Sequence, residues 1–412
     1  MKKQVMPFVL AAFALPACVY SRADARTAPG MSARPVPSAV STREAMESYA
    51  RQFDNLRQID GRCPRDYKLV QLCLLLDTSN SMDGLIDQAK SQLWRIVNEL
   101  SRMNKRGEHI RLEVALYEYG NNDLSASSGY IRQVTSFTQD LDALSEALFS
   151  LDTNGGDEYC GHVIGSSLNR LRWNTSNEGL KLIYIAGNEP FNQGSVNYEV
   201  ACRWAAERGI VVNTIYCGDY QDGVNSFWKR GAEIGRGSYF AINSDKAQHG
   251  IATPYDDELL RLNAMVNKTY IPYGRAGKSR LERQEAQDRN ASALSAPVSV
   301  ERAVTKSSAL YKASDWDLVD ALEQKQVSID HIAKKELPEE LQRMSASELK
   351  GYVSQKQRER STLKVQIAEL SQKRDTYVRQ QEHQSGESDS FGAVILKNLR
   401  DQAAGKHFGT HP

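Results

Sequence analysis

Leu69-Val70-Gln71-Leu72-Cys73-Leu74-Leu75-Leu76 runs directly into Asp77-Thr78-Ser79-Asn80-Ser81. A continuous, mostly apolar run that ends in polar residues predicts a strand buried on both faces, as in a parallel sheet. Open α/β sheets bind their ligands at the carboxyl ends of such strands. Asp77, Ser79 and Ser81 therefore bring a carboxylate and two hydroxyls to a ligand-binding edge. Hard oxygen donors of this kind suit Mg2+ or Ca2+ better than zinc or copper.

The alternation of apolar and amphipathic segments continues along the chain. Apolar runs at 180–185, 210–216 and 238–242 are separated by helix-like patterns. This order predicts a doubly wound, mostly parallel central sheet with helices on both faces. Arg111–Tyr119 alternates apolar and polar residues, which predicts an antiparallel, edge-type strand with a hairpin partner at 130–134.

Asp77-x-Ser79-x-Ser81, placed after a buried strand and before a long helix, resembles the start of the metal-ion-dependent adhesion site of von Willebrand factor type A (VWA) domains. The resemblance covers roughly residues 65–273. It implies a Rossmann-like α/β fold and a non-enzymatic, protein-binding role. In that role, a carboxylate of a protein partner displaces water from the bound metal and gives a directional contact.

Two further loops complete the metal site in this family, and the present sequence departs from the family pattern at both. The second loop, Gly155-Gly156-Asp157-Glu158, carries Glu158 where family members usually have threonine. The third loop, Ala186-Gly187-Asn188-Glu189-Pro190, carries Gly187 where they usually have aspartate. The resemblance then implies that Glu158 contributes a carboxylate ligand and that Glu189 reaches the ion directly or through water.

The expected ligands of Mg2+ or Ca2+ are therefore Asp77, Ser79, Ser81, Glu158 and Glu189. An alternative stays open: the loop holds no metal, and its hydroxyls cap the helix that begins near Gly84, because Ser and Asp are good capping residues.

The amino terminus predicts export from a bacterial-type cytoplasm. Lys2 and Lys3 precede a mostly apolar stretch, residues 6–20, that is too short to span a bilayer. Ala23-Asp24-Ala25 suits ordinary signal-peptide cleavage, whereas Leu15-Pro16-Ala17-Cys18 resembles a lipobox and would leave a lipid anchor at Cys18. The expected location is the periplasm, with an envelope lipoprotein or a secreted protein as alternatives.

The chain divides by composition into six expected segments. They are a signal peptide (1–25), a tether with a short helix (26–64), the VWA domain (65–273), a polar linker (274–312), a helical extension (313–384) and a mostly disordered tail (385–412) in which 391–399 forms a helix. The extension has a narrow apolar stripe, with Leu363 and Ile367 among its members. A second functional hypothesis follows: a metal-free VWA scaffold whose helical arm self-associates, as a coiled coil does.

Other function classes find little support in the sequence. A net charge of +1 without a basic block gives no electrostatic case for nucleic acid. Gly274-Arg275-Ala276-Gly277-Lys278-Ser279 ends like a phosphate-binding loop, but the full motif needs a glycine where Pro272 stands. Cys160 and His162 lie too close in sequence to set a nucleophile–base geometry without further partners. We therefore expect no enzymatic activity.

Overall fold

The apolar run that opens the fold becomes the central strand of a six-stranded sheet. In this computed structural model, β1 (Leu69–Asp77) is buried along its whole length and pairs in parallel with β4 (Arg111–Tyr119) and β6 (Leu180–Gly187). The structure describes residues 66–80, 82–242, 250–385 and 391–410. The predicted signal peptide, the Cys18 anchor, the tether and Ser81 lie outside these ranges.

The strand order of the sheet is β5-β4-β1-β6-β7-β8, with β7 (Val211–Cys217) and β8 (Arg236–Ile242) continuing the parallel pairing. This confirms the predicted doubly wound, mostly parallel sheet. The expectation for Arg111–Tyr119 was wrong in one respect: β4 lies inside the sheet and is parallel to β1. Its antiparallel partner β5 (Ile131–Thr138) is the edge strand, and the alternation in exposure is confined to the start of β4, where Arg111 and Glu113 are partly exposed.

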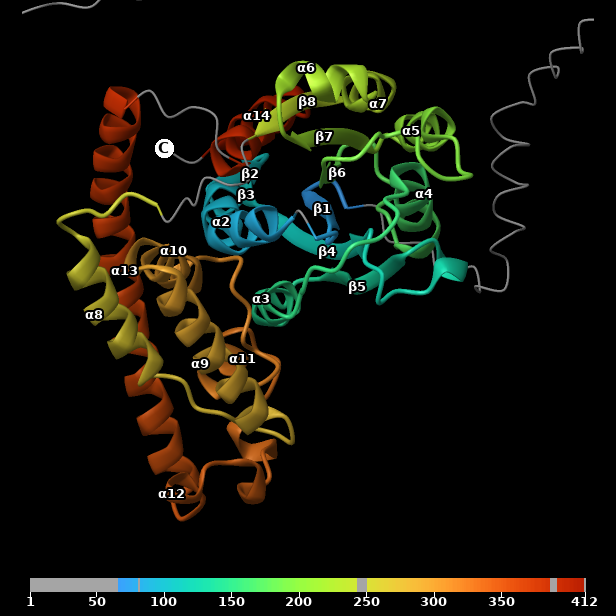
Figure 1. The fold of residues 1–412 in the computed structure, drawn as a ribbon. Helices are drawn as coiled ribbons and strands as arrows, with labels where there is room; N and C mark the ends of the chain where they lie inside the picture. The colour runs from blue at the N-terminus through green and yellow to red at the C-terminus, as the bar shows by residue number, and fades with distance from the viewer. Residues whose placement is uncertain (1–65, 81, 243–249, 386–390, 411–412) are drawn as a thin grey trace, which may run out of the picture. The chain divides into compact units, whose positions relative to one another are not determined.

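Helices cover both faces of the sheet (Figure 1). On one face, α2 (Asp83–Ser101) and α3 (Leu141–Phe149) pack in a single core with every second residue of β1. On the other face, α4 (Cys160–Arg170), α5 (Tyr198–Glu207) and α7 (Trp228–Ile234) pack against the alternate residues. Successive side chains of a strand point to opposite faces of the sheet, and here both faces are covered by an apolar layer. This explains why the run 69–76 has no polar face.

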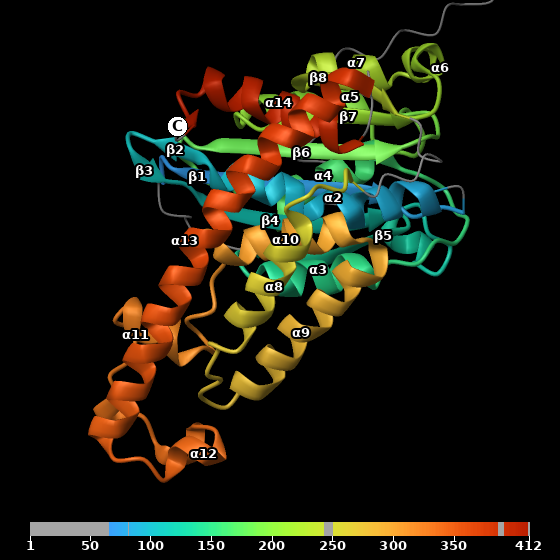
Figure 2. The same cartoon turned by 90° about the vertical axis from the view of Figure 1, so that its left-hand side faces the viewer.

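A helical region follows the sheet in sequence (Figure 2). Its helices are α8 (Asp256–Asn267), α9 (Gly277–Leu294), α10 (Ala296–Ser307), α11 (Leu318–Glu323), α12 (Glu339–Gln342) and the 40-residue α13 (Ala346–Ser385). The predicted linker 274–312 was wrong, because α9 and α10 occupy most of it. The predicted helical extension 313–384 is helical in α11, α12 and α13.

The helicity of α9 could not be detected from apolar periodicity because its buried face is polar. Gln284 and Gln287 are buried on it. Asp288 on the same helix forms ion pairs with Arg302 (2.5 Å) and Lys306 (2.8 Å) of α10, both almost completely buried. Paired charges of this kind are held in place by their partners, and a hydropathy pattern does not register them.

The last helix, α14 (Phe391–Gly405), completes the sheet domain from the far end of the chain. Its Ile395, Leu396 and Leu399 lie in the same apolar core as β1 and α2. The Tyr184 hydroxyl of β6 also donates a hydrogen bond to Asn398 of α14 (2.6 Å). The helix predicted at 391–399 is therefore confirmed, but it extends to Gly405 and is part of the core, so the core reaches beyond the predicted range 65–273.

Three short strands form a second, small sheet. Its order is β3-β2-β9, from Glu108–His109, Met103–Lys105 and Gly409–Thr410. Residues 409–410 thus pair with β2, the strand that directly follows α2. A six-residue helix, α6 (Tyr220–Asn225), lies between β7 and α7. Within the described ranges, no helix combines the length and the apolar character that crossing a membrane requires.

Candidate metal-binding edge of the sheet

Asp77 is the last residue of β1 and its side chain is completely buried. Its Oδ1 accepts a hydrogen bond from the backbone N–H of Ser79 (2.8 Å), which folds the loop back over the strand end. Its Oδ2 and the buried Ser79 Oγ have no hydrogen-bond partner among the described residues. Buried polar atoms are rarely left in this state without a ligand, water or ion.

The second loop brings Glu158 to the same place. Glu158 is 6% exposed, whereas its neighbour Asp157 is exposed and accepts a hydrogen bond from the Tyr159 hydroxyl (3.0 Å). The loop therefore turns one carboxylate toward Asp77 and the other away. Of the two acidic residues in the second loop, Glu158 is the one that the sequence analysis assigned to the metal.

The loops can approach this closely because glycines stand at the points of contact. Gly120 follows β4 with φ +81°, and a Cβ there would lie 2.7 Å from Glu158 Cγ and 2.9 Å from Asp77 Oδ1. A Cβ on Gly156 would lie 2.5 Å from the backbone oxygen of Gly120. All three distances are too short for real side chains, so these two positions require glycine.

The third loop explains one departure from the family pattern. A Cβ on Gly187 would lie 2.9 Å from Asp77 Oδ2 and 2.6 Å from the Tyr119 hydroxyl. The aspartate usual at this position would therefore collide with Asp77 as it is placed here. The Tyr119 hydroxyl fills the space beneath the loop and donates a hydrogen bond to the backbone oxygen of Ala186 (2.9 Å).

Glu189 lies at the rim of the site and is half-buried. Its Oε2 accepts a hydrogen bond from the Gln193 side chain (3.2 Å), and its backbone oxygen accepts one from the Trp228 indole (2.8 Å). Its carboxylate acts on Asp77 and Glu158 through its charge. The assignment of Glu189 as a direct or water-mediated ligand stays a prediction.

The pKa values of two acids at this edge are raised, as expected where several carboxyl groups lie close together without a cation beside them. Burial raises the pKa of Asp77 to about 7. Burial, together with the charges of Asp77 and Glu189, raises the pKa of Glu158 to about 8. A buried carboxylate beside others of the same charge is costly to ionise unless a cation compensates it.

The residues present fit a hard divalent cation, provided that hydroxyls take part. No group of three or more His, Cys, Asp or Glu side chains that could hold a metal lies within the part of the chain that the structure describes. A cation at this edge would therefore rest on Asp77, Glu158 and the hydroxyl of Ser79. The capping alternative is not realised by Ser79: α2 has Met82 at its N-cap and no side-chain cap.

A groove that the sequence did not reveal lies beside this edge. Its volume is about 590 Å³, and its lining includes Glu189, Tyr216, Asp222 and Phe227. Phe227 is 41% exposed and has φ +73°, a left-handed conformation that is rare for bulky residues. No pattern in the sequence marks that backbone conformation, so the groove could be found only in the structure.

The Cys160–His162 pair, which lies under the second loop, has none of the features of a catalytic dyad. Cys160 is fully buried, and burial raises the pKa of its thiol well above the usual value. Burial lowers the pKa of His162 to about 4. A reactive thiol needs the opposite shift and an open environment. The four cysteines in the described ranges, Cys73, Cys160, Cys202 and Cys217, are all buried thiols.

No protein-family model matches this sequence, and no curated protein matches it. Solved structures are similar to part of it. Proximal thread matrix protein 1 from the mussel byssus matches 43% of this chain at 14% identity and a TM-score of 0.33, and the match spans only 42% of that protein. The VWA domain of SpRpn10 matches over 100% of its length, covering 45% of this chain at 15% identity and a TM-score of 0.33. The pilus adhesin SpaC from Lactobacillus rhamnosus GG matches over 29% of its length and 45% of this chain, at 13% identity and a TM-score of 0.34.

Proposed function

We propose that this chain is an exported, non-enzymatic protein-binding module that uses a divalent cation, Mg2+ or Ca2+, at the carboxyl edge of its sheet. The observation that carries the proposal is the pair of buried, unpartnered oxygens, Asp77 Oδ2 and Ser79 Oγ, beside the Glu158 carboxyl. A cation would satisfy both oxygens and compensate the charge of the carboxylates.

In this proposal, Asp77, Ser79 and Glu158 hold the ion, and Ser81 and Glu189 complete its surroundings. A bound cation would offer a remaining coordination position to the carboxylate of a protein partner. The glycines at positions 120, 156 and 187 allow the three loops to close on one point. The adjoining groove between Glu189 and Phe227 would accommodate the side chains that flank the partner's carboxylate.

The second hypothesis, self-association through the arm, finds less support. Leu363 and Ile367, which form the centre of the apolar stripe on α13, are already buried within the chain. Arg360 of the same helix forms ion pairs with Asp317 (2.5 Å) and Asp320 (2.6 Å), which hold α13 against α11. The apolar face of α13 and its buried Arg360 are therefore already in contact with other parts of the same chain.

The test is the unfolding midpoint of the full chain in Mg2+, in Ca2+ and in a chelator. A ligand that binds only the folded state stabilises it by about 2.7 kcal/mol when present at 100 times its Kd. We expect a stabilising shift that Asp77→Asn abolishes and Asp157→Asn preserves. A fluorescent polyglutamate peptide then tests the partner step: it should bind with metal and dissociate with chelator. Equal midpoints in metal and in chelator would refute the proposal.

A further inference from the structure

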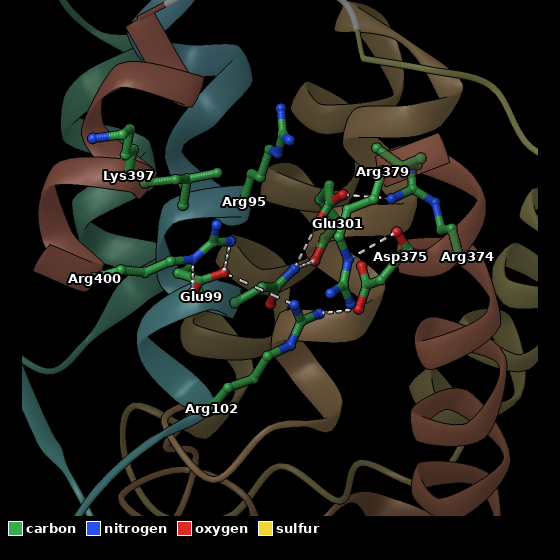
Figure 3. Close-up of a pocket in the computed structure, with 12 residues that line it drawn as sticks. Arg95, Glu99, Arg102, Glu301, Arg374, Asp375, Arg379, Lys397 and Arg400 are labelled. Atoms are coloured by element: carbon green, nitrogen blue, oxygen red, sulfur yellow. Dashed lines mark hydrogen bonds and ion pairs between the residues drawn. The ribbon is translucent and has the colours of Figure 1, made fainter. Parts of the chain in front are cut away.

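A second pocket lies where α2, α13 and α14 meet (Figure 3). Its volume is about 170 Å³. Six cationic side chains line it but only three acidic ones, Glu99, Glu301 and Asp375. The cations are Arg95 and Arg102 of α2, Arg374 and Arg379 of α13, and Lys397 and Arg400 of α14.

The three acids are already engaged by part of this set. Arg400 holds Glu99 with two hydrogen bonds (2.5 and 2.7 Å). Glu301 accepts from Arg374 and from Asn98, and Asp375 accepts from Arg102. Burial alone would raise the pKa of Glu99, but the hydrogen bond and charge of Arg400, with Arg102 and Arg379, lower it. Arg374 also forms an ion pair with Asp256 (3.0 Å), which lies outside the lining. The three lining acids are thus engaged by Arg102, Arg374 and Arg400, and the lining itself has three more cationic than acidic side chains.

Two of the remaining cations stand at the mouth of the pocket. Arg379 is exposed, and among the described residues its Nε donates a hydrogen bond to the backbone oxygen of Asp375 (3.3 Å). Lys397 has 82% of its side chain exposed and forms an exposed ion pair with Asp401 (3.2 Å). Exposed pairs of this kind contribute little energy, so both side chains can turn to an incoming anion at small cost.

We propose that this pocket binds a phosphoryl group, either as free phosphate or as the phosphate ester of a small organic molecule. Planar arginine forks match phosphate oxygens and hold them by charge-assisted hydrogen bonds. Pockets for drug-sized ligands usually start at about 300 Å³, so 170 Å³ suits one phosphoryl group with few attached atoms and excludes a nucleotide. Bound there, the group joins the sheet domain to both C-terminal helices.

The experiment is a calorimetric titration of the full chain with inorganic phosphate and, separately, with glycerol 1-phosphate. Both titrations contain chelator, and a chloride titration at equal ionic strength is the reference. The test variant is the double change Arg379→Gln and Lys397→Gln, which alters exposed side chains only. Lys373→Gln on α13 is the matched control, because Lys373 is exposed and outside the lining.

We expect saturable binding of one phosphoryl group per chain, at least tenfold weaker in the double variant and unchanged in Lys373→Gln. Tighter binding of inorganic phosphate would identify the free ion as ligand, and tighter binding of glycerol 1-phosphate an ester. Asp77→Asn should leave the affinity unchanged, which separates this site from the metal edge. Absence of binding to the unaltered chain, or equal affinity in the double variant, would overturn the proposal.

Discussion

Asp77 and Glu158 face each other across Gly120, whose missing side chain leaves the room that both carboxyls occupy. A Cβ at position 120 would lie within 3 Å of both residues. Asp77 ends strand β1, whereas Glu158 lies in the loop between α3 and α4, far away in sequence. Their approach is therefore a property of the fold, and it concentrates charge where a cation can compensate it.

The first prediction concerns Gly120. Gly120→Ala should lower the free energy of unfolding by about 1–3 kcal/mol, because alanine strains a left-handed backbone and displaces Glu158 or Asp77. Gly107→Ala is the control: Gly107 has φ +79° but nothing within 4 Å of an added Cβ. Urea unfolding of both variants separates the steric cost from the backbone cost. Equal losses would show that the contact at position 120 is unimportant.

The second prediction is a pH dependence. The pKa values of Asp77 and Glu158 are raised to about 7 and about 8 from 3.8 and 4.5, so between pH 4 and 8 the folded chain binds more protons than the unfolded one. The stability that these groups contribute is therefore fully present below pH 4 and is lost as pH rises toward 8. The slope reaches about 1.4 kcal/mol per pH unit for each group.

The measurement for this prediction is the free energy of unfolding from urea titrations across pH 4–8 in chelator. Other groups titrate in the same window, so the quantity to follow is the difference between the unaltered chain and Asp77→Asn. As pH rises, Asp77→Asn should become increasingly stable relative to the unaltered chain. A difference that stays constant with pH would mean that Asp77 keeps an ordinary pKa.

The third prediction concerns the last helix. Leu399→Ala should cost about 2–5 kcal/mol of stability, because it leaves a cavity in the core shared with β1 and α2. Val365→Ala on α13, where the side chain is 58% exposed, should cost almost nothing. Thermal unfolding of the full chain compares the two. A small loss in Leu399→Ala would show that α14 is dispensable for the sheet domain.

The fourth prediction concerns the buried ion pairs of the arm. Arg360→Met should cost about 3–5 kcal/mol, because it leaves the buried carboxylates of Asp317 and Asp320 without their cation. Arg261→Met removes an exposed pair with Glu258 and should change stability by less than about 1 kcal/mol. Denaturant unfolding distinguishes them, and similar effects in both variants would contradict the assignment of α13 as a docked helix.

The sequence predicted the sheet well because its strands carry their signal locally. Leu69–Leu76 is mostly apolar on both faces, and this run became the central strand β1. Helix α9 was missed, whereas the helix predicted at 391–399 is present but ends later, at Gly405 of α14. The buried face of α9 is polar, and α14 owes its place to contacts with residues more than 150 positions away, such as Tyr184.

For the candidate site, the sequence placed Asp77, Ser79 and Glu158 together, and the structure brings these three to one edge. It could not show that Asp157 turns outward, that Gly187 leaves no room for the usual aspartate, or that a groove opens beside Phe227. Each of these depends on backbone geometry at a loop. The arginine-rich pocket was equally hidden, because its cations come from α2 and from α13 and α14, which are distant from α2 in sequence.

The most direct test of the central claim is a calorimetric titration of the full chain with Mg2+ and Ca2+ at pH 6 and pH 8. The account predicts saturable binding that is tighter at pH 8, because the ion must displace protons from Asp77 and Glu158. It also predicts that Asp77→Asn abolishes this binding and that Asp157→Asn retains it. Absence of binding at both pH values, or binding that survives Asp77→Asn unchanged, would contradict a metal site at this edge.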